Sequence, residues 1–292
     1  MPPLIVCGGV HTFRPVPMPN FLCGRFNFSL AQPLVMGIVN VTPDSFSDGG
    51  RFFSAERAIE HGLQLKADGA NILDIGGEST RPGSAPVSID EELARVMPVL
   101  EGLRGADVAI SVDTMKPEVM AAVLRSGADM INDVQGFQAP GALDAVAGSN
   151  CGLCVMHMRG MPKSMQLDPS YEDVVIEVSA FLRQRLFAAQ EAGVDPGRVL
   201  IDPGFGFGKA MEHNLALFKN LDRLTDIAPV LVGVSRKSFL GQLTGHGVTD
   251  RLLPGVVAAL LAIQAGVAVV RVHDVRETVE TIRLWRELRG QE

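Results

Sequence analysis

Short apolar segments alternate with longer segments of helical periodicity through most of this 292-residue sequence, and no other feature constrains the fold as strongly. Each short run is rich in Val, Ile and Leu, and a polar loop separates it from a stretch whose apolar residues recur every three or four positions. The eight runs are 34–39, 71–75, 108–112, 130–131, 153–156, 199–201, 230–234 and 267–272. Strands that alternate with helices form parallel sheets, and eight such units fit a closed barrel better than an open sheet. We therefore expect an α/β protein with a (β/α)8 TIM barrel.

The amino-terminal residues do not follow this repeat. Residues 1–20 are rich in proline, and we expect them to be a loosely ordered extension. Residues 21–33 are typical of a short hairpin, which we expect to cover the lower end of the barrel. No low-complexity linker interrupts the chain from residue 34 onward. We therefore predict one barrel domain over residues 21–292.

Composition and charge exclude several classes of protein. With 47% hydrophobic and 20% charged residues the chain can bury a large core, and its net charge of -7 argues against a nucleic-acid partner. The longest apolar stretch, residues 255–270, contains Gln264 and fits a helix followed by a strand better than a membrane span. No basic region precedes an apolar segment at the amino terminus, as it would in a signal peptide. We expect a cytoplasmic protein without membrane contact.

Cysteine usage agrees with a reducing compartment. Four cysteines in a chain of this length do not make a disulfide framework, and Cys151 and Cys154 lack the second pair that a zinc site needs. Because this pair falls in a predicted strand, we interpret it as part of the core. A redox or metal role is the less favoured alternative.

Polar residues follow every predicted strand, and this is where barrels of this class carry their active sites. A single polar residue there can simply begin a loop or cap a helix. Eight in succession predict a pocket with Asn and Asp at its centre and Arg, Lys and His at its rim. Such a pocket suits a flat, hydrogen-bonding heterocycle joined to an anion. The candidates are Asn40, Arg81, Asp113, Asn132, Met156, Asp202, Gly233, Lys237, Arg271 and His273.

The chemistry of these groups can be divided by residue type. Carboxylates and an Asn amide can pair with the donor and acceptor edge of a heterocycle, which favours Asp113, Asn132 and Asp202. Arg271 and His273 alternate along a strand, share one face and can bind a diphosphate, although a row of surface charges is the alternative. The segment 204–209, Gly-Phe-Gly-Phe-Gly-Lys, lacks the spacing of either nucleotide-binding glycine motif. Its glycines instead allow the backbone to approach a ring on which Phe207 packs.

Two long motifs, Met-Gly-Ile-Val-Asn-Val-Thr-Pro-Asp-Ser-Phe-Ser-Asp-Gly-Gly at 36–50 and Asp-Ile-Gly-Gly-Glu-Ser-Thr-Arg-Pro-Gly at 74–83, resemble the signatures of dihydropteroate synthases. Shorter matches to this family follow in the family's order at 111–114, 131–133, 202–209, 235–237 and 271–274. The resemblance covers about residues 21–288, and motifs of this length are very specific.

The resemblance implies a transferase of folate biosynthesis, the enzyme class that sulfonamides target. Its reaction joins 6-hydroxymethyl-7,8-dihydropterin pyrophosphate to p-aminobenzoate and yields 7,8-dihydropteroate and pyrophosphate. The resemblance also implies a homodimer and a requirement for Mg²⁺. A poorly nucleophilic amine favours a route in which pyrophosphate leaves first.

The resemblance further assigns roles to individual residues. The pterin would be held by Asp113, Asn132, Asp202 and Lys237, with further substrate contacts from Met156, Phe207 and Gly233. Asn40 would help to bind Mg²⁺ and pyrophosphate, and Arg271 and His273 would bind the same anion. Phe46, Asp48, Thr80, Arg81 and Pro82, on two loops, would close over p-aminobenzoate, with Lys237 and Ser238 lining that side and Arg236 at its rim. The catalytic groups would be Asp113, Lys237, Arg271 and His273.

The sequence departs from the family pattern in two places, at 133–140 and at 252–259. In the second place a small polar pair is expected before the helix. Neither departure removes a candidate site residue, although the second could alter the helices that form the dimer. One rival function is a methyltransferase acting on methyltetrahydrofolate, and another is a pterin-binding paralogue without catalytic activity. The intact loop motifs argue against both.

Overall fold

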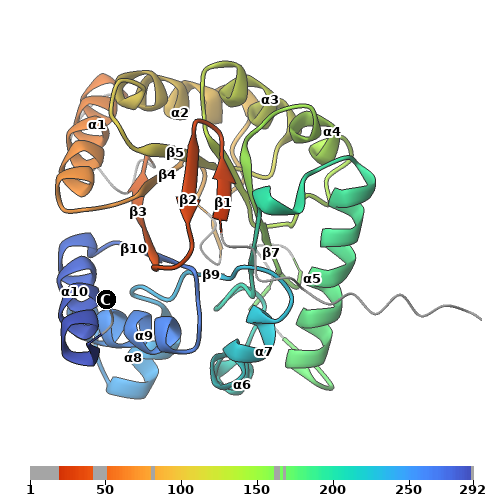
Figure 1. The fold of residues 1–292 in the computed structure, drawn as a ribbon. Coiled ribbons are helices and arrows are strands. Elements are labelled where there is room, and N and C mark those ends of the chain that lie inside the picture. Colours follow the sequence, from red (N-terminus) through yellow and green to blue (C-terminus); the bar gives the residue numbers. More distant parts are fainter. Residues whose placement is uncertain (1–19, 42–50, 80–82, 161–164, 167–168, 291–292) are drawn as a thin grey trace, which may run out of the picture.

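A closed ring of parallel strands forms the centre of the molecule, as the computed structural model shows for residues 20–41, 51–79, 83–160, 165–166 and 169–290 (Figure 1). The strands are Leu34–Asn40 (β3), Ile72–Gly76 (β4), Ala109–Asp113 (β5), Met130–Asp133 (β6), Gly152–Met156 (β7), Val199–Asp202 (β8), Leu231–Val232 (β9) and Val269–Val272 (β10). Their order is β8-β7-β6-β5-β4-β3-β10-β9. A parallel bridge between Ile201 and Val230 joins the two ends of this sheet. The predicted eight-stranded barrel is confirmed, although β9 is shorter than the predicted strand at 230–234.

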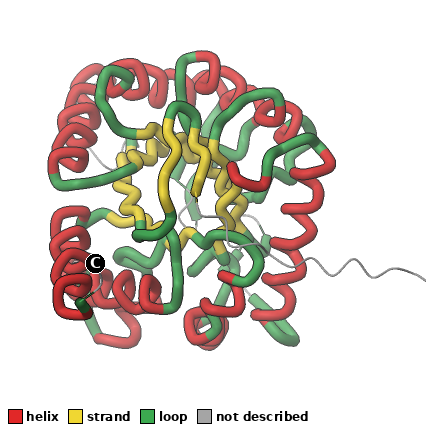
Figure 2. The backbone as a smooth tube through the Cα atoms, viewed as in Figure 1, coloured by secondary structure: helices red, strands yellow, loops and turns green. Residues whose placement is uncertain are grey.

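Helices surround the strands as an outer ring (Figure 2). They are Arg51–Ala67 (α1), Ile89–Leu103 (α2), Pro117–Arg125 (α3), Ala142–Ala147 (α4), Val174–Glu191 (α5), Met211–Lys219 (α6), Leu221–Thr225 (α7), Ser238–Thr244 (α8), Leu252–Gln264 (α9) and Val275–Arg289 (α10). The apolar stretch at 255–270 divides between α9 and β10, as predicted. Within the described ranges no helix has the length and apolar character needed to cross a membrane.

Local sequence signals explain where several helices begin and end. Pro117 occupies the first turn of α3, where its missing N–H costs no hydrogen bond. Gly69, Gly127 and Gly193 have φ values of +103°, +96° and +86° in the turns that follow α1, α3 and α5. Glycine adopts this left-handed conformation without steric cost, which stops each helix before the next strand. The start of α1 at Arg51 lies three residues before the predicted one at Ser54.

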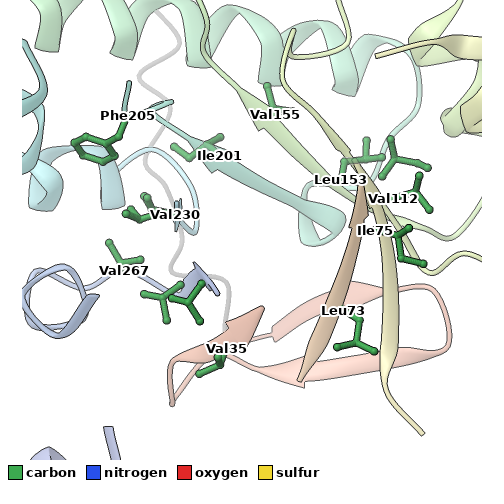
Figure 3. Close-up of a cluster of buried hydrophobic side chains, with 14 of the residues drawn as sticks. Val35, Leu73, Ile75, Val112, Leu153, Val155, Ile201, Phe205, Val230 and Val267 are labelled. Atoms are coloured by element: carbon green, nitrogen blue, oxygen red, sulfur yellow. The ribbon is translucent and has the colours of Figure 1, made fainter. Parts of the chain in front are cut away.

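The larger part of the core lies between the barrel and its helices. Side chains alternate along each strand, so that Leu73 and Ile75 of β4 face outward while Ile72 and Asp74 face the barrel interior. Outward residues such as Val112, Leu153 and Ile201 belong to this layer (Figure 3). The inward positions are therefore divided between apolar residues at one end of the barrel and polar residues at the other.

The amino-terminal end of the barrel is closed by an antiparallel hairpin, Asn20–Cys23 (β1) and Phe26–Ser29 (β2). Phe21 and Cys23 are buried in one cluster with inward residues of the barrel, including Met36 and Ile72. Gly152, the first residue of β7, makes room for the Phe21 ring, because a Cβ there would lie 2.6 Å from it. The predicted covering role of this hairpin is confirmed, and the barrel opens toward the carboxyl ends of its strands.

The predicted core role of the cysteine pair agrees with its burial. Cys151 and Cys154 are buried, and together with Cys23 they form no disulfide within the described part of the chain. Burial raises the pKa of the Cys151 and Cys154 thiols, which disfavours thiolate chemistry at neutral pH. Residues 1–19, on which the prediction of a loose extension rests, lie outside the described residues.

Candidate active site

Candidate residues from six parts of the chain lie at the carboxyl-terminal mouth of the barrel. Because all eight strands are parallel, their carboxyl ends point to the same mouth. Asn40, Asp113 and Asp202 are the last residues of their strands. Asn132 and Arg271 are the third residues of β6 and β10, His273 follows β10, and Lys237 directly precedes α8.

Asp74 joins this group, although the sequence did not single it out as a site residue. It lies in the middle of β4 and is fully buried. Its Oδ2 accepts hydrogen bonds from Arg271 Nε at 2.6 Å and from Asn132 Nδ2 at 3.1 Å. The sequence signal that could have identified Asp74 is a carboxylate in a strand whose other residues are all apolar. Such a group is buried only when it has polar partners.

Arg271 bridges two carboxylates in the barrel interior. Its Nη2 donates to Asp113 Oδ2 at 3.1 Å, in addition to the bond from Nε to Asp74. Burial raises the pKa of Asp113 to about 7, and the positive charge of Arg271 opposes this shift. Burial also disfavours the charged guanidinium, but Asp74 and Asp113 outweigh it and raise the pKa of Arg271.

Three buried polar atoms at this mouth have no hydrogen-bond partner among the described residues: Asp74 Oδ1, Asp113 Oδ1 and Ser111 Oγ. Buried polar groups are nearly always paired, because an unpaired one costs about 1–3 kcal/mol. Two of the three are carboxylate oxygens that act as acceptors while ionised. The geometry therefore calls for a ligand that presents N–H or O–H donors to these oxygens at the mouth of the barrel.

Asp202 and Lys237 are two further ionisable groups at the mouth, and each influences the pKa of the other. Asp202 Oδ1 accepts a hydrogen bond from the Gly204 N–H at 2.7 Å. Burial raises the pKa of Asp202, whereas the Gly204 N–H and the Lys237 charge lower it. Burial, followed by the charge of Arg271, lowers the pKa of Lys237 to about 8. Both side chains thus titrate closer to neutrality than they would in water.

An apolar wall stands beside these charges. Met156 lies in a buried cluster with Met158 and Met165, against which Met115 and Phe207 pack. The Phe207 ring also makes a cation–π contact with the Lys237 ammonium, whose Nζ lies 4.2 Å from the ring centre. Flexible, polarisable methionines and an aromatic ring can both contact the face of a flat ligand. This wall is the counterpart of the polar edge formed by Asp113, Asn132 and Asp202.

The rim contains the remaining described candidates. His273 Nδ1 lies 3.1 Å from Ser235 Oγ, and burial, with Arg271 and Arg236 nearby, lowers the pKa of His273 to about 3. Arg236 is exposed, has a φ of +58° and pairs with Asp274 at 2.5 Å. His273 is therefore neutral at physiological pH and can contact an anion as an N–H donor.

Gly233 and Ser238 are the remaining predicted site residues within the described ranges. Gly233 follows β9 beside Arg271, since a Cβ there would lie 3.9 Å from the Arg271 Cβ. Ser238 is exposed at the first position of α8. Five predicted loop residues lie outside the described residues: Phe46, Asp48, Thr80, Arg81 and Pro82.

The predicted magnesium ligand, Asn40, is a single partly buried amide at the end of β3. Its side chain has no hydrogen-bond partner within the described ranges, and those ranges contain no cluster of three or more His, Cys, Asp or Glu that could hold a metal. Mg²⁺ often keeps several waters and binds through one or two protein oxygens together with substrate phosphates. A single amide oxygen fits that mode of binding, in which waters and a phosphate ligand would supply the other donors.

Comparison with known proteins defines the class of this barrel and site. Residues 36–273 match the family described as pterin binding enzyme. The chain belongs to this family.

Its relatives are dihydropteroate synthases. The chain is 46% identical to the Escherichia coli (strain K12) enzyme over 260 residues, which cover 88% of this chain and 92% of that protein. The structure of the Xanthomonas albilineans enzyme with 4-aminobenzoic acid superposes with a TM-score of 0.88 and 49% identity, covering 94% of this chain and 99% of the other. The Burkholderia cenocepacia enzyme complexed with 7,8-dihydropteroate gives a TM-score of 0.84 and 47% identity, covering 96% and 98%.

Proposed function

We propose that this chain is a dihydropteroate synthase, which joins 6-hydroxymethyl-7,8-dihydropterin pyrophosphate to p-aminobenzoate and releases pyrophosphate. The relatives that carry this name cover almost the whole chain, and two of their structures hold p-aminobenzoate or the product. The observation that carries the proposal is the group of buried, partly unpaired acceptors at the mouth, Asp74 and Asp113, which share the cation Arg271. A pterin supplies the missing N–H donors, and its pyrophosphate supplies an anion for the cation.

Pterin recognition would use the polar edge of the pocket. Because Asn132 Nδ2 already donates to Asp74, its Oδ1 is left to accept a hydrogen bond from the ring. Asp113 and Asp202 add charge-assisted acceptors, and Lys237 adds a donor for a ring carbonyl or nitrogen. Met156 and Phe207 would contact the faces of the ring, with Gly233 leaving space beside it. Recognition would thus combine an edge of acceptors with two apolar faces.

The pyrophosphate would lie at the rim. Arg271 is a permanent cation whose Nε and Nη2 are held by Asp74 and Asp113, which leaves Nη1 to donate to the anion, and the neutral imidazole of His273 adds an N–H donor. Asn40 would hold Mg²⁺ together with the pyrophosphate oxygens, and Arg81 would approach from its loop. When bound, Mg²⁺ would neutralise charge on the leaving pyrophosphate.

The reaction breaks the C–O bond of the pterin methylene and forms a C–N bond to the aromatic amine. The C–O electron pair leaves with pyrophosphate, and the amine lone pair then forms the new bond, after which the nitrogen loses one proton. Asp74 and Asp113 would stabilise positive charge that develops on the pterin as pyrophosphate departs. On the amine side, Lys237 and Ser238 would line the p-aminobenzoate pocket, with Arg236 at its rim and Phe46, Asp48, Thr80 and Pro82 supplied by the two loops.

One assay tests this function against its rivals. Pyrophosphate release should require both the pterin pyrophosphate and p-aminobenzoate, and dihydropteroate should form in equal amount. EDTA should abolish the release and added Mg²⁺ should restore it. A paralogue without activity would release none, and a methyltransferase would instead consume methyltetrahydrofolate.

The outer surface supports a homodimer. Apolar side chains of α9 and α10, helices that pack against each other, remain exposed in the single chain: Leu253 (69%), Val257, Leu261, Leu284 and Leu288 (78%). Exposed apolar side chains gathered on two neighbouring helices are typical of a protein interface, and self-association about a twofold axis is the commonest way to cover them.

The variant Val257→Glu/Leu261→Glu tests the dimer. It should sediment as a monomer at concentrations at which wild type is a dimer, because it buries two carboxylates in the proposed interface. Ile176→Glu, at an equally exposed apolar residue on α5, is the matched control and should leave the oligomeric state unchanged. A monomeric wild type would refute this part of the proposal.

A further inference from the structure

The loop between β8 and α6 is anchored by a buried lysine, Lys209, which is not one of the predicted site residues. Lys209 is 2% exposed, and its Nζ lies 2.9 Å from His157 Nδ1, 2.9 Å from the Gly204 carbonyl oxygen and 3.0 Å from that of Phe207. An ammonium group has three N–H donors, which these three acceptors can satisfy, and the His157 carbonyl oxygen is a fourth, more distant acceptor at 3.4 Å. Burial lowers the pKa of Lys209 to about 7. At pH values below this pKa the side chain is charged, and these hydrogen bonds stabilise the charged form.

His157 is suited to accept from this ammonium. It directly follows β7, and its ring stands edge-on to Phe181 with the ring centres 4.9 Å apart. Burial, followed by the charge of Lys209, lowers the pKa of His157 to about 2, so the imidazole is neutral. A neutral imidazole that accepts at Nδ1 carries its proton on Nε2. Lys209 and His157 therefore tie the loop after β7 to the loop after β8.

The backbones of the loop after β7 and the loop after β8 are in close contact. Gly204 has a φ of +70°, and a Cβ there would lie 1.9 Å from the His157 carbonyl oxygen. Gly208 has a φ of +64°, and a Cβ there would lie 2.2 Å from the Arg159 carbonyl oxygen. The glycines thus allow direct backbone contact, and the lysine supplies the polar bonds that hold it.

The carbonyls that Lys209 binds belong to the two loop residues that shape the pocket. Gly204 donates its N–H to Asp202 Oδ1 at 2.7 Å, and the Phe207 ring faces Lys237 Nζ at 4.2 Å. Both features therefore depend on the position of the same short loop. Lys209 itself is buried beneath this loop and is fully occupied by protein acceptors.

We propose that Lys209 and His157 are a pair of positioning residues, which set the Asp202 carboxylate and the Phe207 ring for the pterin and, through the contact of Phe207 with Lys237, the amine side of the site. This rests on the proposed dihydropteroate synthase function. Neither residue touches substrate in this scheme, and the effect passes through the Gly204–Lys209 loop.

Two variants of nearly equal size separate this role from simple packing. In His157→Asn, an amide oxygen can replace Nδ1 as the acceptor for Lys209, whereas His157→Leu removes the acceptor and keeps the volume. We expect His157→Leu to raise KM for the pterin and for p-aminobenzoate by about tenfold, because the loop that carries Gly204 and Phe207 loses a charge-assisted hydrogen bond to its anchor. His157→Asn should keep both KM values within about threefold of wild type. Lys209→Met should resemble His157→Leu, provided that it folds.

A purely structural role would give a different pattern, in which less protein is active and the apparent kcat falls while both KM values stay at the wild-type level. That result in His157→Leu, or equal damage in His157→Asn and His157→Leu, would overturn the proposal. Amide hydrogen exchange of residues 204–208 provides a test that needs no activity assay: protection should fall in His157→Leu and persist in His157→Asn. Unchanged protection in His157→Leu would also overturn it. A wild type that releases no pyrophosphate would instead refute the proposed function, while the exchange result would still report on the anchoring.

Discussion

At the scale of single residues, the carboxylates at the mouth of the barrel differ in the hydrogen bonds that they already accept from the protein. Asp74 has both Arg271 and Asn132 on one oxygen, whereas Asp202 has one backbone N–H from Gly204. Asp202 therefore has the greater capacity left for a ligand, whereas Asp74 orients Arg271 and Asn132 through Oδ2 and keeps only Oδ1 unpaired.

Replacing Asp202 by Asn should weaken pterin binding by a few kcal/mol, because a charge-assisted acceptor becomes an amide that can present N–H to other donors. Thermal unfolding should change much less, since only one hydrogen bond to the protein is affected. Titration calorimetry with a pterin measures the first quantity. Unchanged pterin affinity would remove Asp202 from the site.

The buried neutral histidine gives a pH dependence of stability with a defined sign. The pKa of His157 is lowered to about 2 in the folded protein, against an ordinary value near 6.5. The unfolded chain therefore binds the extra proton first, and the stabilisation that is present above pH 6.5 is lost progressively as pH falls toward 2. Between pH 6.5 and 5 this loss amounts to about 2 kcal/mol for one group.

Because Asp113 and His273 also titrate abnormally, the test is the difference between wild type and His157→Leu in urea unfolding at both pH values. Asp113 has a raised pKa and acts with the opposite sign over this range, and His273 acts with the same sign. Wild type should lose about 2 kcal/mol more than the variant on acidification. Equal losses would mean that His157 is protonated in the folded state.

At the scale of elements, the loop after β4 is joined to α2 and α3 by a buried charge cluster. Lys116, which precedes α3, contacts Glu78 of the loop and Glu92 of α2, the latter at 2.5 Å. Glu92 is fully buried, and its second carboxylate oxygen has no partner in the described part of the chain. Glu78 also accepts from the Val87 N–H at 3.2 Å, so the cluster holds both ends of this loop.

Lys116→Met should reduce the free energy of unfolding by about 3–5 kcal/mol, since it leaves the Glu92 charge buried without a cation. The double variant Lys116→Met/Glu92→Gln should recover much of this loss, because the second change removes the uncompensated charge. Urea unfolding of the two variants measures the coupling. Equal stability of the two would show that the ion pair contributes little.

At the scale of the whole molecule, one end of the barrel is closed by apolar packing and the other presents polar groups. The hairpin of β1 and β2 supplies Phe21 and Cys23 to the closed end, far along the sequence from most of the strands that they contact. Stability and chemistry are thus placed at opposite ends, and changes at the closed end should spare the reaction.

Phe21→Ala should cost about 3–5 kcal/mol of stability, because the ring is almost fully buried, while KM for both substrates should stay at the wild-type level. Removal of residues 2–19, the predicted extension, should leave both stability and KM unchanged. Denaturant unfolding combined with steady-state kinetics distinguishes the two variants. A large loss of stability on removing residues 2–19 would show that the domain begins before the hairpin.

The order of the elements, the barrel and the positions of most site residues followed from the sequence by itself. These properties are local, since strand and helix periodicity, helix stops at Gly69 or Gly127 and polar residues after strands all depend on neighbours in the chain. Tertiary structure decided which groups pair, because pairing depends on barrel closure and on burial. Arg271 meets Asp74 across 197 residues and Asp113 across 158, and Lys209 meets His157 across 52. Sequence spacing carries no information about such distances, so Asp74 and the Lys209–His157 pair emerged only when parallel strands had brought their carboxyl ends together.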